Sequence, residues 1–549
     1  MAAQLRSYQE RVIRLLWHWF KENKKGNPLV WMPTGSGKSH IIAEIGRVAV
    51  RHPGQKILVI TPSKELCDQD YQKMLDHLGP ADVGILSASM QRYDLDARII
   101  VSTIGTAYNR AAGLGKVSLI IIDEAHRTSN ENVGMIRKLV ARLSEKTPNL
   151  RILGLTATPF RGSGVWLHRT KSSLFTEIAA KITIDELVAA GHLCRIAPAK
   201  TKFQIDAKDV KTFGTGDYVI SDLVKRWDIE EVTQKACAEM VALGKDQKSW
   251  IVFCCTVKHA QNVWRELTVK HKIDAELIVG TTHRKERESM VRRHRSGELR
   301  CLVSVAVLTT GFDSPGTDFI ALLRNTRSPI MWVQLVGRAM RPHPNKSERP
   351  ALIADFTDTS LVMGPVDKIQ GRDPRKTSGE PVMKTCPSCG CVVAGSTAEC
   401  PECGHIFPKK EPKPRVNDRA SGVEVLGKSE LHTYKVDRVF YTRHKKKGKP
   451  DSMRVDYFYG IRRLASEWIC VEHTGYAKHT AAAWWLERYP GGRQFQMDLV
   501  PKSVDVALTL APRLKKPAQI VVNLAAEHPR IVLHKYLDDH RRARTTRAG

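Results

Sequence analysis

The sequence has 549 residues, of which 42% are hydrophobic, and a formal net charge of +30 with a pI near 9.7. This length is too great for one hydrophobic core, and the apolar content is too high for a disordered chain. No apolar run reaches the about eighteen residues that span a bilayer, and the charged N-terminus is unlike a signal peptide. We therefore expect several domains, a cytoplasmic location and no membrane partner. An excess of positive charge this large favours a nucleic-acid partner over a merely solubilising surface.

Two successive series of short apolar segments predict two parallel α/β sheets. The segments lack polar alternation, as do strands that are covered on both faces. Helical patterns separate them, so we expect two α/β domains in tandem, at residues 1–200 and 201–363. The predicted strands are 28–32, 56–60, 97–101, 119–123 and 151–156 in the first series, and 249–254, 276–280, 299–305, 318–323 and 350–356 in the second.

The remainder of the chain is divided by two segments that are rich in Gly, Pro or charge, 364–383 and 409–428, which we interpret as linkers. They flank a cysteine-rich module at 384–408. From 429 to 549 a strand-like alternation returns together with a helix-like stretch, which predicts a small α+β domain.

This end of the chain is strongly basic. Residues 404–549 hold 29 Lys and Arg against 15 Asp and Glu, nearly half of the excess charge of the whole protein. The run "RHKKKGKP" (443–450) is expected to form a hairpin loop that contacts phosphate, or else a merely solvated loop. Trp484 and Trp485 lie in an Ala-rich helical pattern, which favours packing in a core over base stacking.

The stretch "MPTGSGKS" (32–39) follows a predicted strand and precedes a predicted helix. Backbone N–H groups of such a loop can surround a β-phosphate, while Lys38 reaches the β- and γ-oxygens and the Ser39 hydroxyl holds Mg²⁺. The alternative is a tight strand-to-helix turn without a ligand. We assign the nucleotide site here to Thr34, Gly35, Ser36, Gly37, Lys38 and Ser39.

Two further motifs supply charged side chains for phosphate chemistry. "LIIIDEAH" (119–126) ends a buried strand with Asp123, which suits Mg²⁺, and Glu124, which can orient and deprotonate an attacking water. "QLVGRAMRP" (334–342) predicts a helix with Arg338 and Arg341 on one face, where two guanidinium groups can neutralise a transferring phosphoryl group. Each motif alone is better explained as a polar strand cap or a surface helix. Together they predict an ATPase site between two domains.

In this order the motifs resemble those of a superfamily 2 helicase of the DExH type, over roughly residues 4–358. The resemblance implies two RecA-like domains, with Gln9 as the reader of adenine, Thr156 and Thr158 as the link between the nucleotide and DNA sites, and Gly311 and Asp313 as further nucleotide contacts. The segments that carry it, besides those above, are "LRSYQ" (5–9), "TPSKEL" (61–66), "VSTIGT" (101–106), "LTATPFR" (155–161), "VFCCTVKHA" (252–260) and "VAVLTTGFDSP" (305–315).

Within that superfamily the chain resembles the bacterial RadD DNA-repair ATPases, through "LGLTATPFR", "VAVLTTGFD" and "DEAH" followed by a four-cysteine module. This implies a role in DNA repair, recombination or replication, with single-stranded, forked or branched DNA and single-stranded-DNA-binding protein as partners. The stretch "EWICVEHTGYAKHTAAAWW" also resembles the tails of phage-encoded helicases, which implies a bacterial cytoplasm or that of a phage host.

We therefore expect an ATP- and Mg²⁺-dependent DNA helicase or translocase that acts as a monomer. Three alternatives remain open at this point. The first is an RNA helicase of the same superfamily, and the second is the motor subunit of a restriction complex, which would need a nuclease on another chain. The third is a DNA-binding recombination scaffold that uses ATP as a switch and does not unwind.

Two Cys-x-x-Cys pairs predict a zinc ribbon, because four thiolates at this spacing suit tetrahedral Zn²⁺ and would fold a stretch that has no core of its own. Four thiolates leave no open coordination position, so the zinc would be structural, and the ribbon would act as a rigid mount. The alternative is a set of reduced thiols. The predicted ligands are Cys386, Cys389, Cys400 and Cys403, with the nearby Cys391 and His405 left out.

Metal analysis of protein purified without chelator should therefore find one zinc per chain. Cys400→Ser should release it, because three thiolates hold the ion less tightly than four. Cys301→Ser, in a predicted core strand, is the matched control and should keep its zinc. A wild-type protein without zinc would contradict the ribbon.

Overall fold

The structure is a computed structural model. It describes residues 5–537 except for 24, 89, 129–133, 163, 203, 206, 208–209, 213–216, 228, 306, 310–311, 313, 348, 374–382, 386–387, 389–391, 395–404, 406–424, 428–429, 490–499 and 526–528.

The first domain contains an eight-stranded sheet. Its strands are β1 Pro28–Trp31, β2 Ile57–Thr61, β3 Val83–Ser87, β4 Arg92–Tyr93, β5 Ile99–Thr103, β6 Leu119–Asp123, β7 Arg151–Thr156 and β8 Glu177–Lys181. They lie in the order β4-β3-β5-β2-β6-β7-β1-β8, and only β4 runs antiparallel to its neighbour. All five strands predicted for this domain are confirmed.

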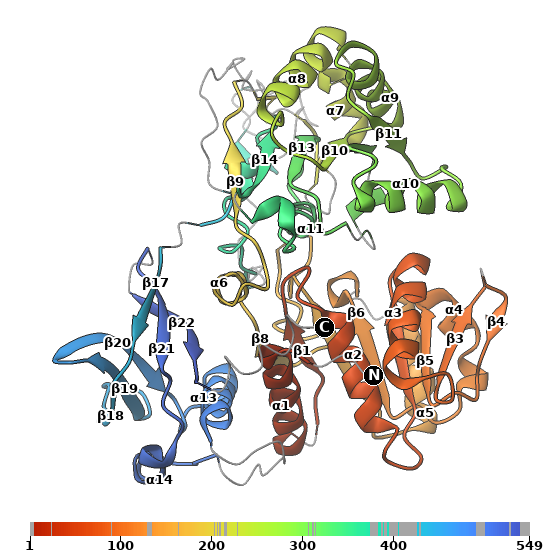
Figure 1. The fold of residues 1–549 in the computed structure, drawn as a ribbon. Coiled ribbons are helices and arrows are strands. Elements are labelled where there is room, and N and C mark those ends of the chain that lie inside the picture. The colour runs from red at the N-terminus through yellow and green to blue at the C-terminus, as the bar shows by residue number, and fades with distance from the viewer. Residues whose placement is uncertain are drawn as a thin grey trace.

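Helices cover both faces of this sheet (Figure 1). One buried apolar cluster joins α1, α2 and α3 to the sheet, and a second joins α4 and α5 to its other face. The two-sided cover explains why the strands are apolar throughout, since neither face meets water. The helices are α1 Ser7–Glu22, α2 Lys38–Ala49, α3 Lys64–Leu78, α4 Ile104–Asn109, α5 Met135–Lys146 and α6 Ile184–Ala189.

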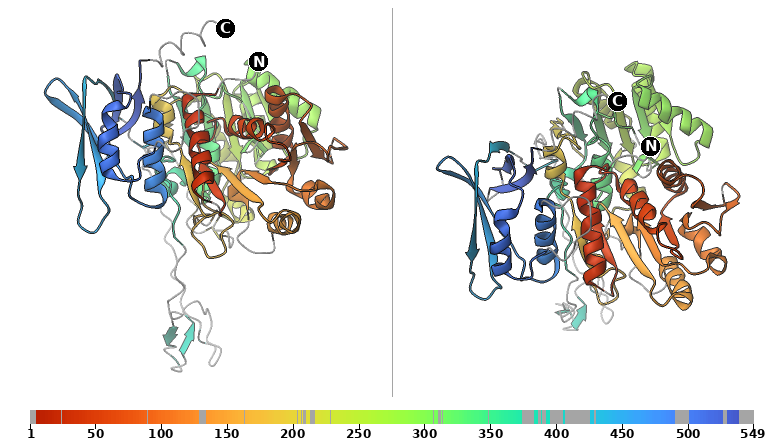
Figure 2. Two further views of the ribbon diagram at one scale, coloured as in Figure 1. Left: turned by 90° about the horizontal axis from the view of Figure 1, so that it is seen from below. Right: turned by 60° about the horizontal axis from the view of Figure 1, so that its bottom comes forward.

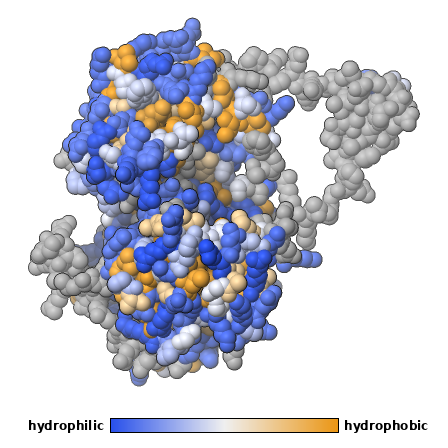
Figure 3. Space-filling model, turned by 90° about the vertical axis from the view of Figure 1, so that its right-hand side faces the viewer, coloured by the Kyte–Doolittle hydropathy of each residue, from blue (hydrophilic) through white to orange (hydrophobic). Residues whose placement is uncertain are grey.

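The second domain contains a six-stranded parallel sheet in the order β11-β12-β10-β13-β14-β9. Its strands are β9 Ile196–Ala199, β10 Trp250–Cys254, β11 Ala275–Ile278, β12 Cys301–Ser304, β13 Phe319–Leu323 and β14 Ala351–Asp355. Its helices are α7 Ile220–Trp227, α8 Glu230–Leu243, α9 Val257–Arg265, α10 Arg284–Ser296, α11 Pro329–Gly337 and α12 Thr359–Met363. The space-filling view shows the two α/β domains as two lobes (Figure 3).

Two expected boundaries need correction. Strand β9 precedes residue 201 but pairs with β14, so the second domain begins before the predicted boundary. The expected linker 364–383 is packed over its first part: Val366 is buried, and the Arg372 carbonyl accepts a hydrogen bond from the Trp166 N–H at 3.2 Å. Burial of the Val366 side chain and the hydrogen bond at the Arg372 carbonyl stabilise this segment in its packed position.

The C-terminal region contains both helices and antiparallel sheets. Two three-stranded antiparallel sheets, β17-β21-β22 and β18-β19-β20, enclose a core that contains Trp484 and Trp485, so the core interpretation of both tryptophans is confirmed. The elements are β17 Leu431–Lys435, β18 Arg438–His444, β19 Ser452–Tyr459, β20 Arg462–Ile469, α13 Gly475–Arg488, α14 Val504–Leu510, β21 Gln519–Asn523 and β22 Arg530–Lys535.

This C-terminal domain packs against the first α/β domain. Figures 1 and 2 show α13 beside α1, and the His479 ring lies 3.0 Å from a Glu177 carboxylate oxygen of β8. Ala483 belongs to the same buried cluster as side chains of α1 and the first sheet. The C-terminal domain is thus packed directly against the first domain. Among the helices that the structure describes, none has the length and apolarity to cross a membrane.

Candidate nucleotide-binding site

The loop between β1 and α2 has the geometry of a phosphate-binding loop. Gly35 and Gly37 have φ of +80° and +77°, which glycine adopts without strain, and α2 begins directly at Lys38. The turn thus leads directly into the N-terminus of α2, and a helix N-terminus favours an anion. The predicted residues from Thr34 to Ser39 are brought together in this one turn.

Helix α1 supports the loop from outside. The Gln9 Nε2 lies 3.3 Å from the Ser36 carbonyl oxygen, and the Tyr8 hydroxyl donates to the same oxygen at 2.7 Å. The other end of the Gln9 amide accepts the Arg6 N–H at 2.9 Å. A Cβ at Gly37 would lie only 2.6 Å from Gln9 Nε2, so the loop and the amide require glycine there. That Gln9 reads adenine stays a prediction.

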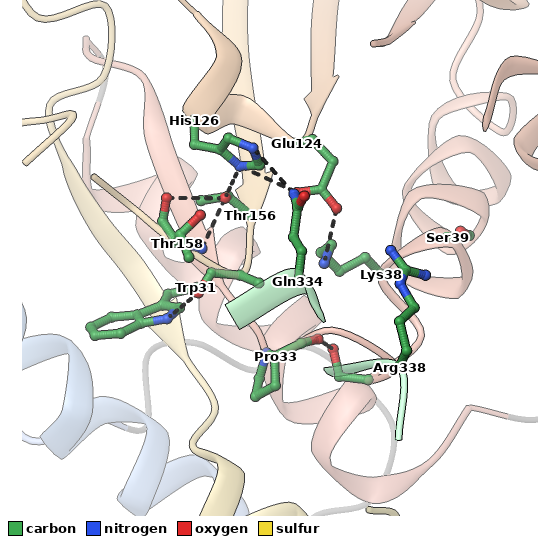
Figure 4. A network of polar contacts seen from close by, with 12 residues as sticks. Trp31, Pro33, Lys38, Ser39, Glu124, His126, Thr156, Thr158, Gln334 and Arg338 are labelled. Atoms are coloured by element: carbon green, nitrogen blue, oxygen red, sulfur yellow. Dashed lines mark hydrogen bonds and ion pairs between the residues drawn. The ribbon is translucent and has the colours of Figure 1, made fainter. Parts of the chain in front are cut away.

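The two carboxylates of the DEAH motif lie beside the loop. Strand β6 ends at Asp123, and Glu124 adopts a left-handed backbone with φ of +49°. This conformation is costly for a non-glycine residue and is typical of functional sites. Glu124 Oε1 lies 3.6 Å from the Lys38 ammonium nitrogen (Figure 4).

The surroundings give the two carboxylates different proton affinities. Burial, with the neighbouring Glu124 and Asp70 carboxylates, raises the pKa of Asp123. Burial also acts on Glu124, but Lys38 and further cations outweigh it, so that its pKa lies below the usual value. Glu124 is therefore ionised at neutral pH, as an acceptor of a proton must be.

The oxygen atoms at the end of β6 suit Mg²⁺. Among the described residues Asp123 Oδ1 has no hydrogen-bond partner although it is buried, and the Ser39 hydroxyl, 3.3 Å from the Lys73 ammonium nitrogen, stands at the start of α2. A carboxylate and a hydroxyl are hard ligands of the kind that Mg²⁺ prefers. Asp123 and Ser39 would thus hold the ion together with phosphate oxygens.

A histidine that the sequence reading did not single out connects three motifs. His126 Nδ1 lies 3.0 Å from the Thr156 hydroxyl and 3.3 Å from a Glu124 oxygen, and its Nε2 lies 3.4 Å from Gln334 Nε2 (Figure 4). Burial lowers the pKa of His126 to about 4, so the ring is neutral at pH 7. The position of His126 at the end of the DEAH motif is a sequence signal for a functional role. Its partners Thr156 and Gln334 could not be identified from the sequence, because they are distant along the chain.

The arginine motif reaches the loop from the second domain, although not as predicted. Helix α11 ends at Gly337, so Arg338 caps it and Arg341 lies in the following turn, not on one helical face. A Cβ at Gly337 would lie 2.8 Å from the Thr34 Cβ, and one at Gly35 would lie 3.2 Å from the Arg341 Cγ. The end of the helix thus rests directly on the phosphate loop.

Both guanidinium groups are largely buried beside the loop. Arg338 Nη1 donates to the Phe312 carbonyl at 2.5 Å, which orients the group. Burial lowers the pKa of Arg338 and of Arg341 to about 10, and both therefore remain charged at neutral pH. Their role as arginine fingers stays a prediction. Gly311 and Asp313, and the cysteines at 386, 389, 400 and 403, lie outside the described residues.

Comparison with known proteins accounts for this geometry. Residues 2–161 match the family described as type III restriction enzyme, res subunit, and residues 232–343 match the helicase conserved C-terminal domain. Two segments of the chain are thus similar to helicase domains, and together with relatives named as ATP-dependent helicases they support an ATP-hydrolysing helicase enzyme. The first matched segment contains the phosphate loop and the second contains the arginine motif.

Relatives match the motor and not the whole chain. A Schizosaccharomyces pombe protein named as mitochondrial ATP-dependent helicase irc3 is 27% identical over 65% of this chain, which spans 58% of the length of irc3. The DNA 3'-5' translocase XPB2 of Sulfurisphaera tokodaii is 24% identical over 64% of this chain and 81% of its own. Among solved structures, a fragment named as the HsdR subunit of a type I restriction enzyme from Vibrio vulnificus shares the fold, with a TM-score of 0.51, 18% identity and 67% of each chain covered.

We expect Glu124→Gln to stop ATP turnover by the motor while nucleotide binding persists, because an amide cannot accept the proton of the attacking water. Lys38→Ala should instead weaken ATP binding, because it removes the cation at the phosphates. Steady-state phosphate release and equilibrium binding of a fluorescent nucleotide separate the two effects. Wild-type ATP turnover in Glu124→Gln would contradict the assignment of Glu124 as the general base.

Arg338→Ala and Arg341→Ala should each lower turnover by about 10³-fold with little loss of ATP affinity, since arginine fingers act on charge that develops in the transition state. The matched control is Arg349→Ala, an exposed arginine beyond the motif whose ion pair with Asp246 lies on the surface. If either variant lost nucleic-acid binding but kept its basal ATP turnover, we would assign that arginine to the nucleic-acid-binding surface instead.

Proposed function

We propose that the protein is a DNA-dependent ATPase that uses its superfamily 2 motor to translocate along or unwind DNA, in repair, recombination or replication. The resemblance to RadD ATPases and the similarity to a protein named as a DNA translocase support DNA as the track. The net charge of +30 supports a polyanionic partner of either kind. Single-stranded, forked or branched DNA and single-stranded-DNA-binding protein are the proposed partners of a monomer in a bacterial or phage-host cytoplasm.

The observation that carries the proposal is the contact of the second domain with the phosphate loop of the first. Arg341 packs on Gly35, and Gln334 meets His126 beside Glu124. A nucleotide held by the loop would therefore be contacted from both domains. Closing and opening of the two domains is then coupled to the state of its γ-phosphate.

The proposed chemistry assigns a separate task to each group. Lys38 and the backbone N–H groups of the loop bind the β- and γ-phosphates, and Glu124 orients a water for in-line attack and takes its proton. Arg338 and Arg341 stabilise the charge on the transferring group. Bound Mg²⁺, held by Asp123 and Ser39, supplies further neutralisation of phosphate charge. His126 would hold Glu124 and Thr156 in position, so that the LTATPFR segment (155–161) responds to changes at the phosphate.

We also propose that the four cysteines bind one structural zinc. Two short antiparallel strands, β15 Met383–Thr385 and β16 Val392–Ala394, support this, because the first Cys-x-x-Cys pair lies in the segment that connects them. A connection between paired strands is a suitable place for a zinc knuckle, which needs both thiolates on one turn. The ribbon would then brace the passage from the motor to the C-terminal domain.

ATP turnover titrated against single-stranded, duplex and forked DNA and against single-stranded RNA tests the function. We expect DNA to stimulate turnover several-fold more than RNA, and Glu124→Gln to remove the stimulated rate. A larger response to RNA would contradict the proposal and indicate an RNA helicase. A DNA-stimulated rate without displacement of a labelled strand, and without movement past a bound streptavidin block, would indicate an ATP-switched scaffold instead.

A further inference from the structure

The sheet β18-β19-β20 of the C-terminal domain has one face in the core and one face in solvent. Along β19 the side chains of Met453, Val455 and Tyr457 are fully buried against the rest of the domain. On the opposite face Phe440 of β18 is 48% exposed and Trp468 of β20 is 50% exposed. Single exposed apolar side chains are common on protein surfaces, whereas a group of large exposed side chains on one face often marks an interaction surface.

These aromatic side chains stand in two groups on the outer face. Phe440 and Phe458 meet edge to face with ring centroids 5.3 Å apart. Trp468 lies 5.9 Å from the His444 ring, and the Arg454 guanidinium carbon is 5.9 Å from the Trp468 centroid. The register places Arg454 directly opposite Trp468. Phe458 and Arg454 are four residues apart on β19, so the groups lie about 13 Å apart.

Positive charge surrounds the face. Residues 438–469 hold nine Lys and Arg against three Asp and Glu. The hairpin loop between β18 and β19 exposes four lysines, and Arg462 and Arg463 are exposed at the opposite end of the sheet. The lysines of the loop are Lys445, Lys446, Lys447 and Lys449. Among the described residues, these four lysines and the two arginines form no ion pair.

The single carboxylate on the face itself is already neutralised. Asp456 Oδ1 accepts a charge-assisted hydrogen bond from Arg454 at 3.0 Å and is largely buried. Of the other two, Glu467 points into the core and Asp451 pairs with Arg443 at 2.7 Å. A negatively charged ligand therefore meets no uncompensated repulsion on this surface.

We propose that Phe440, Phe458, Trp468 and Arg454 form an aromatic platform that binds single-stranded nucleic acid. Bases would stack on the exposed rings, and the lysine loop and the two arginines at the opposite end would contact phosphates on either side. Interleaved aromatic and cationic side chains on an antiparallel sheet suit unpaired bases, whose faces are free to stack. An apolar protein partner would not match the six free cations, and duplex DNA has no exposed base face.

The platform is separate from the motor, so its failure can be told apart from failure of the proposed function. The probe is a fluorescent oligodeoxythymidine of about 15 nucleotides, the upper range for one such module, with 5-iodouracil at single positions. Ultraviolet cross-linking to the full chain without nucleotide, followed by peptide mass spectrometry, identifies the contacted aromatic residues. Anisotropy gives the affinity.

We expect cross-links to Trp468 or to Phe440, and about tenfold weaker binding for Trp468→Ala, with most of the affinity restored in Trp468→Phe. Replacing the four loop lysines by alanine should flatten the salt dependence by about 0.7 in slope for each phosphate that the variant no longer neutralises. Val506→Ala, which truncates a comparably exposed side chain on α14 of the same domain, is the matched control and should bind as wild type.

Cross-links confined to residues 5–363, together with wild-type affinity in Trp468→Ala, would overturn the platform even if DNA stimulates the ATPase. A face used by a protein or by a second copy of the chain would give that same result. Thermal unfolding of each variant excludes loss of the fold as the cause, and cross-linking of the wild-type chain keeps the test decisive if the alanine variant is unstable. A wild-type ATPase that no nucleic acid stimulates would count against the motor proposal alone.

Discussion

The two halves of the motor meet where Gly337 rests on Thr34. A Cβ at Gly337 would lie 2.8 Å from the Thr34 Cβ, so no other residue allows the end of α11 to approach the phosphate loop this closely. Arg338 follows at once, and Gln334 stands one turn earlier, so their positions over the loop depend on the same contact. The distance between the domains at the nucleotide site is thus set by backbone proximity, not by a flexible side chain.

The close contact between the two domains places several positively charged side chains together in a region that is shielded from water. Lys38, Lys73, Arg338 and Arg341 converge near Glu124 and Asp123, and burial lowers the pKa of both arginines to about 10. Holding desolvated cations together costs free energy that a neighbouring carboxylate only partly offsets. A triphosphate between the two domains would compensate them. This cost supports the proposal that the site binds a polyanion.

The sequence was informative where local chemistry decides the structure. All ten predicted strands are present, the phosphate loop lies between β1 and α2, and Asp123 ends β6. The sequence was less informative where contacts between distant parts of the chain determine the structure. Strand β9 has no apolar signal of its own that assigns it to the second sheet, and α11 stops at Gly337 because its end meets the loop, which placed Arg341 off the expected helix. The roles of His126 and Gln334 depend on a contact between residues more than two hundred positions apart.

The C-terminal domain shows the same limit. The alternation in β19 and β20 was visible in the sequence, but Phe440, Phe458 and Trp468 form one surface only through the register of three strands. Trp484 and Trp485, which are more conspicuous in the sequence, are in the core. Trp484 donates to Glu467 at 2.5 Å, and Arg488, buried beside them, pairs with Glu467 at 3.6 Å. Burial opposes ionisation of Glu467, yet His534 and Arg488 outweigh it and lower its pKa to about 2, so this ion network holds α13 to the sheet at any physiological pH.

The attachment of α13 to α1 determines how such a domain can serve a motor. Helix α1 carries Gln9 against the phosphate loop at its start and meets α13 further along, where Trp19 and His479 share the Glu177 carboxylate. The aromatic platform therefore lies on a domain that packs against the phosphate-loop domain, whereas the arginine motif belongs to the other domain. If the platform binds a strand as proposed, it would hold that strand beside the first domain. Deleting the domain would expose the apolar surface of the motor that Ala483 covers, so point substitutions on the platform separate its binding role from its structural one.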